Sequence, residues 1–179
     1  MAEITGAPVG RFLKSRIFDP LGMSDTHTFF SPDVPWAARM NSTYRRGRIT
    51  WKKYWDNTKK QERPFFPACG GVYTTVFDYA RFLTAWMDCG KYEAGRILSR
   101  ASVVEAAKRQ SDAGHGYHWS ILDDPTSEGE LPVFGHGGAD GTIAVAHPQL
   151  DMLILYFTQS RGTSTTNEFR AAVEELLQP

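Results

Sequence analysis

The spacing of apolar residues predicts helices in the first part of the chain. Apolar positions three and four residues apart line one face over residues 9–17, and Asp19-Pro20 ends this segment. Thr75 and Asp78 have the spacing of a capping box, and the apolar face that follows them extends to Gly90. We therefore expect one helix near the N-terminus and a longer one that begins after Thr75.

Two other stretches of the first 110 residues are less regular. Ser102 and Glu105 repeat the capping spacing and predict a shorter helix. Residues 24–68 show no sustained period and are interrupted by Pro32, Pro35, Pro64 and Pro67. We expect a long excursion there, with short elements at most.

Short strands dominate the pattern from residue 117 onward. Four segments are rich in β-branched and aromatic residues and are separated by Gly, Pro and Asp: residues 117–122, 131–136, 142–146 and 152–158. Residues 147–151 fit a hairpin connection between the last two. The pattern predicts an antiparallel meander.

The last apolar stripe predicts a C-terminal helix. Thr165 and Glu168 fit a capping box, and the stripe consists of Phe169, Val173, Leu176 and Leu177. The predicted fold is α+β: an antiparallel sheet of three to four strands with a C-terminal helix packed on it, preceded by helices and long loops. We expect residues 1–179 to form a single domain, mainly helix and loop over 1–110 and sheet plus helix over 111–179.

Composition narrows the class of protein. The 179 residues include 20 basic and 20 acidic side chains, so net charge gives no reason to expect a polyanionic partner. Basic residues outnumber acidic ones 13 to 8 over residues 1–90 and are outnumbered 7 to 12 over residues 91–179, so the two halves should attract each other. No apolar run approaches the roughly 20 residues that a bilayer span needs, and residues 1–10 lack the pattern of a signal peptide. We expect no membrane partner, and the cellular location stays open.

The sequence does not indicate a metal site. Cys69 and Cys89 lie 20 positions apart, which matches no zinc spacing, so free thiols are the expected state. His115 and His118 could share a metal ion from a helix. The glycines on both sides of His115 favour a strand entry instead, where alternate residues diverge.

The densest chemical signal is a glycine-rich segment between two predicted strands. Residues 134–142 read Phe-Gly-His-Gly-Gly-Ala-Asp-Gly-Thr, with the histidine at position 136. Glycine in a strand packs nothing and allows a ligand or another backbone to approach closely. Bare amides on a strand edge suit an oxyanion, and a histidine beside them can transfer a proton. The alternative is a glycine-rich turn with an incidental surface histidine.

Five segments in the same order resemble the serine β-lactamase-like hydrolases. They are residues 17–23 (IFDPLGM), 69–82 (CGGVYTTVFDYARF), 95–99 (GRILS), 116–119 (GYHW) and the segment around His136. The family includes class C β-lactamases, penicillin-binding carboxypeptidases, D-aminopeptidases and related esterases. The resemblance implies a partial β-lactamase/transpeptidase-like fold, acyl transfer from an amide or ester through an acyl-serine, and no metal or organic cofactor.

The resemblance also implies roles for individual residues. His136-Gly137-Gly138 is similar to the family's His-x-Gly box, which lies on a strand beside the nucleophile. His136 would hydrogen-bond the acidic or carbonyl end of the substrate and help set the protonation of neighbouring catalytic groups. The N–H of Ala139 would be one of two oxyanion-hole donors. Gly137 and Gly138 would leave the strand bare enough for the substrate to lie alongside as an added strand.

The family's nucleophile is not found in this sequence. Family members use the serine of a Ser-x-x-Lys turn, which occurs nowhere here, and the Tyr-x-Asn box is absent too. The nearest spacing, Thr50 to Lys53, lies in a polar stretch on the wrong side of the other landmarks. The chain therefore resembles the C-terminal portion of such a hydrolase and is not expected to turn over substrate alone. We expect a missing N-terminal segment, or self-association, to cover the sheet.

Residues 39–63 interleave nine basic side chains with aromatic ones. Such a segment can bind single-stranded nucleic acid, but the neutral total charge leads us to expect no nucleic-acid partner. Within the resemblance this region lies over the mouth of the active site. Trp51, Tyr54 and Trp55 are therefore candidate contacts to an acyl, lactam or peptide substrate. A further alternative is a non-catalytic module that holds a peptide or acyl ligand, or pairs with a partner.

Overall fold

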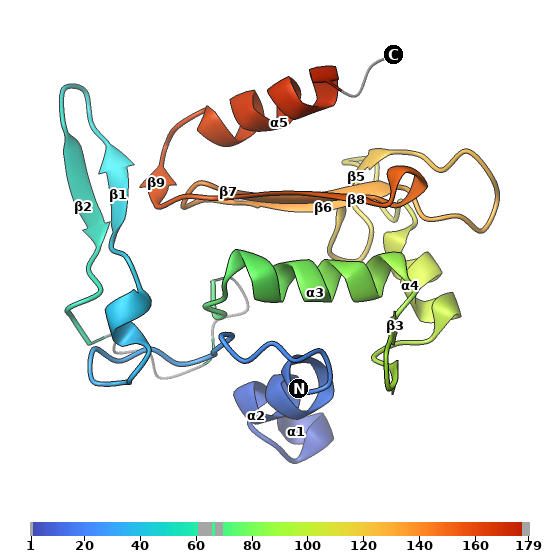
Figure 1. Cartoon of the computed structure of the whole chain (residues 1–179), viewed down its shortest axis with the longest axis horizontal. Coiled ribbons are helices and arrows are strands. Elements are labelled where there is room, and N and C mark those ends of the chain that lie inside the picture. The colour runs from blue at the N-terminus through green and yellow to red at the C-terminus, as the bar shows by residue number, and fades with distance from the viewer. Residues whose placement is uncertain (1, 61–65, 67–69, 177–179) are drawn as a thin grey trace.

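The computed structural model of the chain describes residues 2–60, 66 and 70–176, and these residues form stacked layers around one sheet. Figure 1 shows helix α5 (Thr165–Leu176) on one face of the sheet and helix α3 (Val76–Met87) on the other, with the N-terminal helices beyond α3. Each layer buries an apolar face that its own sequence pattern supplies.

Four antiparallel strands form the central sheet, in the order β5-β6-β7-β8. Their bounds are Ser120–Asp123, Val133–Gly138, Thr142–His147 and Met152–Phe157. The short 3-10 helix η3 (Pro148–Leu150) connects β7 to β8. The predicted meander and the α+β fold class are confirmed.

The core lies between the sheet and α3. Leu83 and Trp86 of α3 are buried against Trp119 and Phe134, and α4 (Arg100–Ala107) adds the fully buried Val103. The α3 helix begins as predicted, because the Thr75 hydroxyl accepts a hydrogen bond from the backbone N–H at position 78, at 3.2 Å.

Helix α4 begins earlier than predicted. Its N-cap is Ser99, whose hydroxyl accepts from the Ser102 N–H at 3.1 Å, so Ser102 lies inside the first turn. Two serines three residues apart offer two capping positions, and the helix takes the one that adds a turn.

The second face of the sheet packs against α5. Phe169 stacks on Tyr156 with ring centroids 4.6 Å apart, and Val173 packs on the same cluster. Helix α5 begins at Thr165, so Ser164 occupies the N-cap position in place of the predicted Thr165; its carbonyl accepts from the Glu168 N–H at 3.0 Å, and its hydroxyl donates to the Glu168 carboxylate. Leu176 was predicted to be buried and is 85% exposed, because α5 rises away from the sheet toward its C-terminal end (Figure 1). Leu177 lies outside the described residues.

The N-terminal helices pack on the outer side of α3. After α1 (Ala2–Thr5), α2 (Val9–Leu13) continues directly into a π-helical turn, η1 (Lys14–Phe18). Phe18, Leu21 and Met23 are buried against Ala85 of α3. The predicted N-terminal helix is therefore present, with a π-helical second half.

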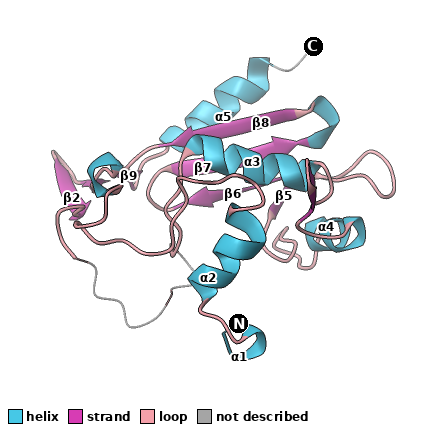
Figure 2. Ribbon diagram, turned by 60° about the horizontal axis from the view of Figure 1, so that its bottom comes forward, coloured by secondary structure: helices cyan, strands magenta, loops and turns pink. Residues whose placement is uncertain are grey.

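The excursion over residues 24–60 contains only short elements, as predicted: η2 (Ala37–Arg39), β1 (Thr43–Arg46) and β2 (Trp51–Trp55). The two strands form a hairpin that projects at one end of the molecule (Figure 2). Strand β1 also pairs in parallel with β9 (Ser160–Arg161), which gives a small sheet in the order β2-β1-β9.

Two elements lie outside the functional region. Strands β3 (Lys91–Tyr92) and β4 (Gly95–Arg96) form a hairpin between α3 and α4. Cys89, just before this hairpin, is buried with a free thiol. Cys69 lies outside the described residues. Within the described part of the chain, no helix has the length and hydropathy to cross a bilayer.

A buried carboxylate joins the excursion to α3. Asp78 is 2% exposed and accepts hydrogen bonds from the Asp25 N–H at 2.8 Å and the Thr26 hydroxyl at 2.9 Å. Arg81 donates to its other oxygen at 2.7 Å. These three donors satisfy the hydrogen-bonding capacity of the buried carboxylate. Removal of the carboxylate would leave the donors without an acceptor.

We expect Asp78→Ala to lower the free energy of unfolding by about 3 kcal/mol, because the buried donors at Asp25 and Thr26 lose their acceptor. Urea unfolding followed by circular dichroism measures this change. The matched control is Asp112→Ala, at an exposed loop position, with an expected change below about 0.5 kcal/mol. Equal effects of the two variants would contradict the role assigned to Asp78.

Candidate active site

The glycine-rich segment forms the C-terminal half of β6, and there one edge of the strand is open. Strand β5 pairs only with Val133–Gly135, whereas β7 pairs along β6 as far as Gly138. Before β5 the chain turns away, because the Gly116 N–H bonds the Trp119 carbonyl at 2.9 Å. Among the described residues, His136–Gly138 therefore has no strand partner on its β5 side.

The glycines of β6 serve different purposes. A Cβ at Gly135 would collide with the carbonyl oxygen of Ala144, so this glycine allows β7 to approach. At Gly137 the nearest atom to a Cβ would be the Thr142 carbonyl oxygen at 3.7 Å, which is an ordinary contact. Packing requires glycine at position 135 and does not require it at position 137.

The chain leaves β6 through a tight turn that contains Ala139. The Gly141 N–H bonds the Gly138 carbonyl at 3.1 Å, and Gly141 has a φ of +88°. A turn closed by a left-handed glycine is a common three-residue hairpin loop. Ala139 is exposed, and within the described part of the chain its N–H donates to no acceptor.

The segment after β8 holds this turn in place. The Ser160 N–H donates to the Asp140 carbonyl at 2.9 Å, and the Thr158 N–H and hydroxyl donate to the Gly141 carbonyl at 3.0 and 2.7 Å. The Arg161 Nε lies 2.5 Å from a carboxylate oxygen of Asp140. Asp140 and Gly141 belong to the glycine-rich motif, whereas Thr158, Ser160 and Arg161 were not predicted from the sequence to belong to the site, because they lie well beyond the motif along the chain.

His136 is exposed on β6 and lies in a group of three imidazoles. Its ring stacks on that of His118, with centroids 5.3 Å apart and planes 7° apart, and the His115 ring centroid is 6.4 Å away. The His136 Nδ1 lies 2.6 Å from the Gly137 carbonyl oxygen, which requires a proton on that nitrogen. Partial burial, and secondarily the charge of His136, lower the pKa of His118.

The three aromatic residues predicted to contact substrate do not form one surface. Tyr54 lies on the face of Arg45, whose Cζ is over its ring, whereas Trp51 is paired with Arg46 on the other face. Trp55 packs into an aromatic cluster instead, with its ring centroid 4.9 Å from Phe30 and 6.3 Å from Tyr73. Tyr54 is linked to the site through Arg161, which pairs with Asp140 and lies over the Tyr54 ring, 4.2 Å from the centroid.

The described residues offer no metal centre: over 2–60, 66 and 70–176, no three His, Cys, Asp or Glu side chains are placed to hold an ion. The arrangement instead combines an open strand edge, an exposed backbone donor and imidazoles. These groups can bind an extended ligand, donate a hydrogen bond to a developing oxyanion and exchange a proton.

A protein-family model described as Beta-lactamase matches residues 1–178. The chain belongs to the beta-lactamase family. Protein Rv1367c of Mycobacterium tuberculosis is 28% identical over 185 residues, which cover 89% of this chain and 45% of that protein. The predicted resemblance is confirmed.

Solved structures share the fold. A mutant of simvastatin synthase from Aspergillus terreus matches with a TM-score of 0.77 at 16% identity, over 98% of this chain and 51% of the other. D-amino acid amidase from Ochrobactrum anthropi, complexed with L-phenylalanine amide, matches with a TM-score of 0.63 at 25% identity, over 98% and 52%. The chain spans about half the length of these beta-lactamase-like proteins.

Substitution of Gly135 and Gly137, two of the three glycines of β6, should show which position packing restricts to glycine. We expect Gly135→Ala to lower the free energy of unfolding by about 2 kcal/mol, because the new methyl group meets the β7 backbone. Gly137→Ala should change it by less than about 1 kcal/mol, because the space beside Gly137 is open. Chemical denaturation of both variants measures this difference, and a reversed order would refute the packing assignment.

The histidine group makes a prediction about pH. The folded pKa of His118 lies below 6.5, so the unfolded chain binds more protons as the pH falls through 6.5. The stability from neutral His118 is complete above pH 6.5 and is lost as the pH falls through the folded pKa.

Titration of the imidazole resonances by NMR measures this shift. We expect His136→Gln to raise the pKa of His118, because a neighbouring charge is removed, and to leave it below 6.5, because the partial burial remains. A native His118 pKa at or above 6.5 is incompatible with the assigned cause.

Proposed function

We propose that this chain forms the substrate-strand and oxyanion half of a serine hydrolase, whose reaction is acyl transfer from an amide or ester. The supporting observation is the open edge of β6 at His136–Gly138, which leads directly to the exposed N–H of Ala139. A ligand paired with this edge lies beside a donor that is free to bond its carbonyl oxygen.

The substrate would bind as a short added strand. An extended peptide or acyl-amide can use its own N–H and C=O groups to pair with the edge at Gly137 and Gly138, where no side chain intervenes. Phe134 and Gly135 precede this point on β6 and are already paired with β5 on one side and with β7 on the other. The available edge therefore begins after Gly135. The amide ligand of the D-amino acid amidase with the same fold is consistent with this class of substrate.

Ala139 would act as an oxyanion donor and His136 as a proton-handling group. The turn that presents the Ala139 N–H is held by the bonds from Thr158 and Ser160, so the donor is oriented before the ligand arrives. Preorganised donors of this kind stabilise the charge that develops on a carbonyl oxygen during attack. The His136 imidazole, with a proton on Nδ1, has its other nitrogen available to accept one.

The nucleophilic serine and its lysine would come from polypeptide other than these 179 residues, since no Ser-x-x-Lys occurs in them. An oxyanion donor without a nucleophile forms no acyl-enzyme. The absence of Ser-x-x-Lys from these residues therefore favours a second candidate function. In this alternative, the same edge serves a non-catalytic module that binds peptide or acyl ligands.

Binding can be tested without turnover. We expect Ala139→Pro to weaken the binding of acetyl-D-alanine p-nitroanilide about tenfold, because the variant loses one hydrogen-bond donor. Position 139 is the second residue of the turn, where proline is favoured, so the turn should persist. Ala139→Ser keeps the N–H and is the control. Binding is followed through the NMR amide shifts of Gly137 and Gly138, and unchanged affinity in Ala139→Pro would remove the basis of the proposal.

Turnover of nitrocefin and of a short-chain nitrophenyl ester separates the two candidate functions. We expect the chain alone to hydrolyse neither, and to bind the anilide nonetheless, since it carries the edge but not the nucleophile. Hydrolysis that His136→Ala abolishes, and that survives replacement of every serine in turn, would contradict the acyl-serine reaction.

A further inference from the structure

Three basic side chains form a row across the small sheet next to the oxyanion turn. Arg45 of β1 pairs with Lys52 of β2 on one side and with Arg161 of β9 on the other. Residues directly opposite in neighbouring strands point to the same face, and the strands are about 4.8 Å apart. The row of Lys52, Arg45 and Arg161 therefore spans about 10 Å on one face.

An aromatic ring fixes two members of the row. The Cζ atoms of Arg45 and Arg161 lie 4.3 Å and 4.2 Å from the centroid of the Tyr54 ring. Cation–π contacts at this distance hold a guanidinium group in place without neutralising its charge. The two arginines thus share one ring, and neither depends on a flexible loop for its position.

Within the part of the chain that the structure describes, one carboxylate pairs with the row. Like charges directly opposite each other destabilise a pair of strands. Asp140 pairs with Arg161, but within the described residues neither Arg45 nor Lys52 has a carboxylate partner. The neighbouring Lys53, on the opposite face, is paired with Asp56 at 3.4 Å. Among the described residues, the three basic side chains of the row therefore have one carboxylate partner, Asp140.

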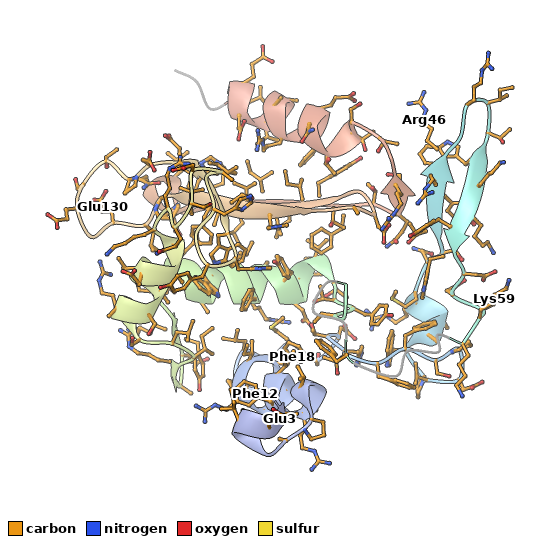
Figure 3. All side chains as sticks on the ribbon, turned by 180° about the vertical axis from the view of Figure 1, so that it is seen from behind. Glu3, Phe12, Phe18, Arg46, Lys59 and Glu130 are labelled. Atoms are coloured by element: carbon orange, nitrogen blue, oxygen red, sulfur yellow. The ribbon has the colours of Figure 1, made fainter. Side chains whose placement is uncertain are left out.

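The row lies beside the groups assigned to the reaction. Arg161 contacts Asp140, which directly follows Ala139, and strand β9 begins at the Ser160 that bonds the Asp140 carbonyl. Figure 3 shows Arg46 on the same hairpin at one end of the molecule and Glu130 at the opposite end, so the basic hairpin stands apart from the acidic loop between β5 and β6. An anion held by the row would lie on the turn side of the open edge.

We propose that Lys52, Arg45 and Arg161 bind a carboxylate on the acyl side of the substrate, remote from the bond that reacts. This inference rests on the proposed function, because it places the substrate on the β6 edge. Arginine presents a planar pair of donors that fits a carboxylate, and Lys52 adds a third positive charge. The substrate class is therefore an amide or ester whose acyl group ends in a carboxylate.

The test compares glutaryl-D-alanine p-nitroanilide with its neutral methyl ester, using the chain as it is. We expect the acid to bind about tenfold more tightly than the ester at low salt, and the difference to shrink as salt is added. Arg45→Gln and Lys52→Gln should each weaken binding of the acid about threefold or more, and leave binding of the ester unchanged.

The matched control is Arg46→Gln, which removes the same charge from the other face of the same hairpin. We expect it to leave the preference for the acid intact. Equal affinity of acid and ester, or equal losses in Arg46→Gln and Arg45→Gln, would overturn the proposal. Tighter binding of oligothymidylate than of the acid, with Arg46→Gln and Arg45→Gln equally affected, would also overturn it and indicate a general polyanion surface.

The two proposals fail in different ways. If the ester binds and depends on the Ala139 N–H, while the acid binds no better, the edge function stands and the carboxylate site is wrong. If the acid binds better in an Arg45-dependent manner and Ala139→Pro has no effect on either ligand, the carboxylate site stands and the oxyanion assignment is wrong.

Discussion

The close backbone approach of β6 and β7 at Gly135 is the constraint on which the site depends. No Cβ fits between the strands there, so the pairing that continues through His136 to Gly138 has one register. That register decides which residues of β6 lie beyond the end of β5, and therefore how much of the edge is open. The same pairing presents alternate β7 residues to the two cores, with Ala144 toward α3 and Val145 toward α5.

The turn after β6 is supported by residues some twenty positions further along the chain. Thr158, Ser160 and Arg161 all bond it, and they do so because β8 returns alongside β7 and ends next to the turn. Orientation of the Ala139 N–H therefore depends on tertiary contacts from the end of the meander as well as on the turn's own hydrogen bond from Gly141 to Gly138. Strand β9 then joins the turn to the β1–β2 hairpin, so strand pairing connects the basic row to the turn at the end of the open edge.

Sequence patterns predicted the parts of this structure that local chemistry controls. The capping of α3 by Thr75 and the four strands follow from short-range spacing and composition. The choice of Ser99 over Ser102 as the N-cap of α4 could not be predicted in this way, because both serines satisfy the same local rule. The packing of Trp55 against Phe30 was not predictable for a different reason: it depends on contacts between segments that are distant in the sequence. The hydrogen bond from Ser160 to the turn was not predictable for the same reason, because it also joins distant segments.

The shortness of the open edge has a consequence for the behaviour of the protein in concentrated solution. Long unpaired edges recruit the edges of other molecules and build intermolecular sheets. Here β5 covers β6 as far as Gly135, and the exposed remainder, His136–Gly138, is about 10 Å long at the usual rise per residue. A second molecule could form only a few ladder bonds along that length, whereas a small extended ligand needs no more. The geometry that admits a ligand thus also discourages aggregation through this edge.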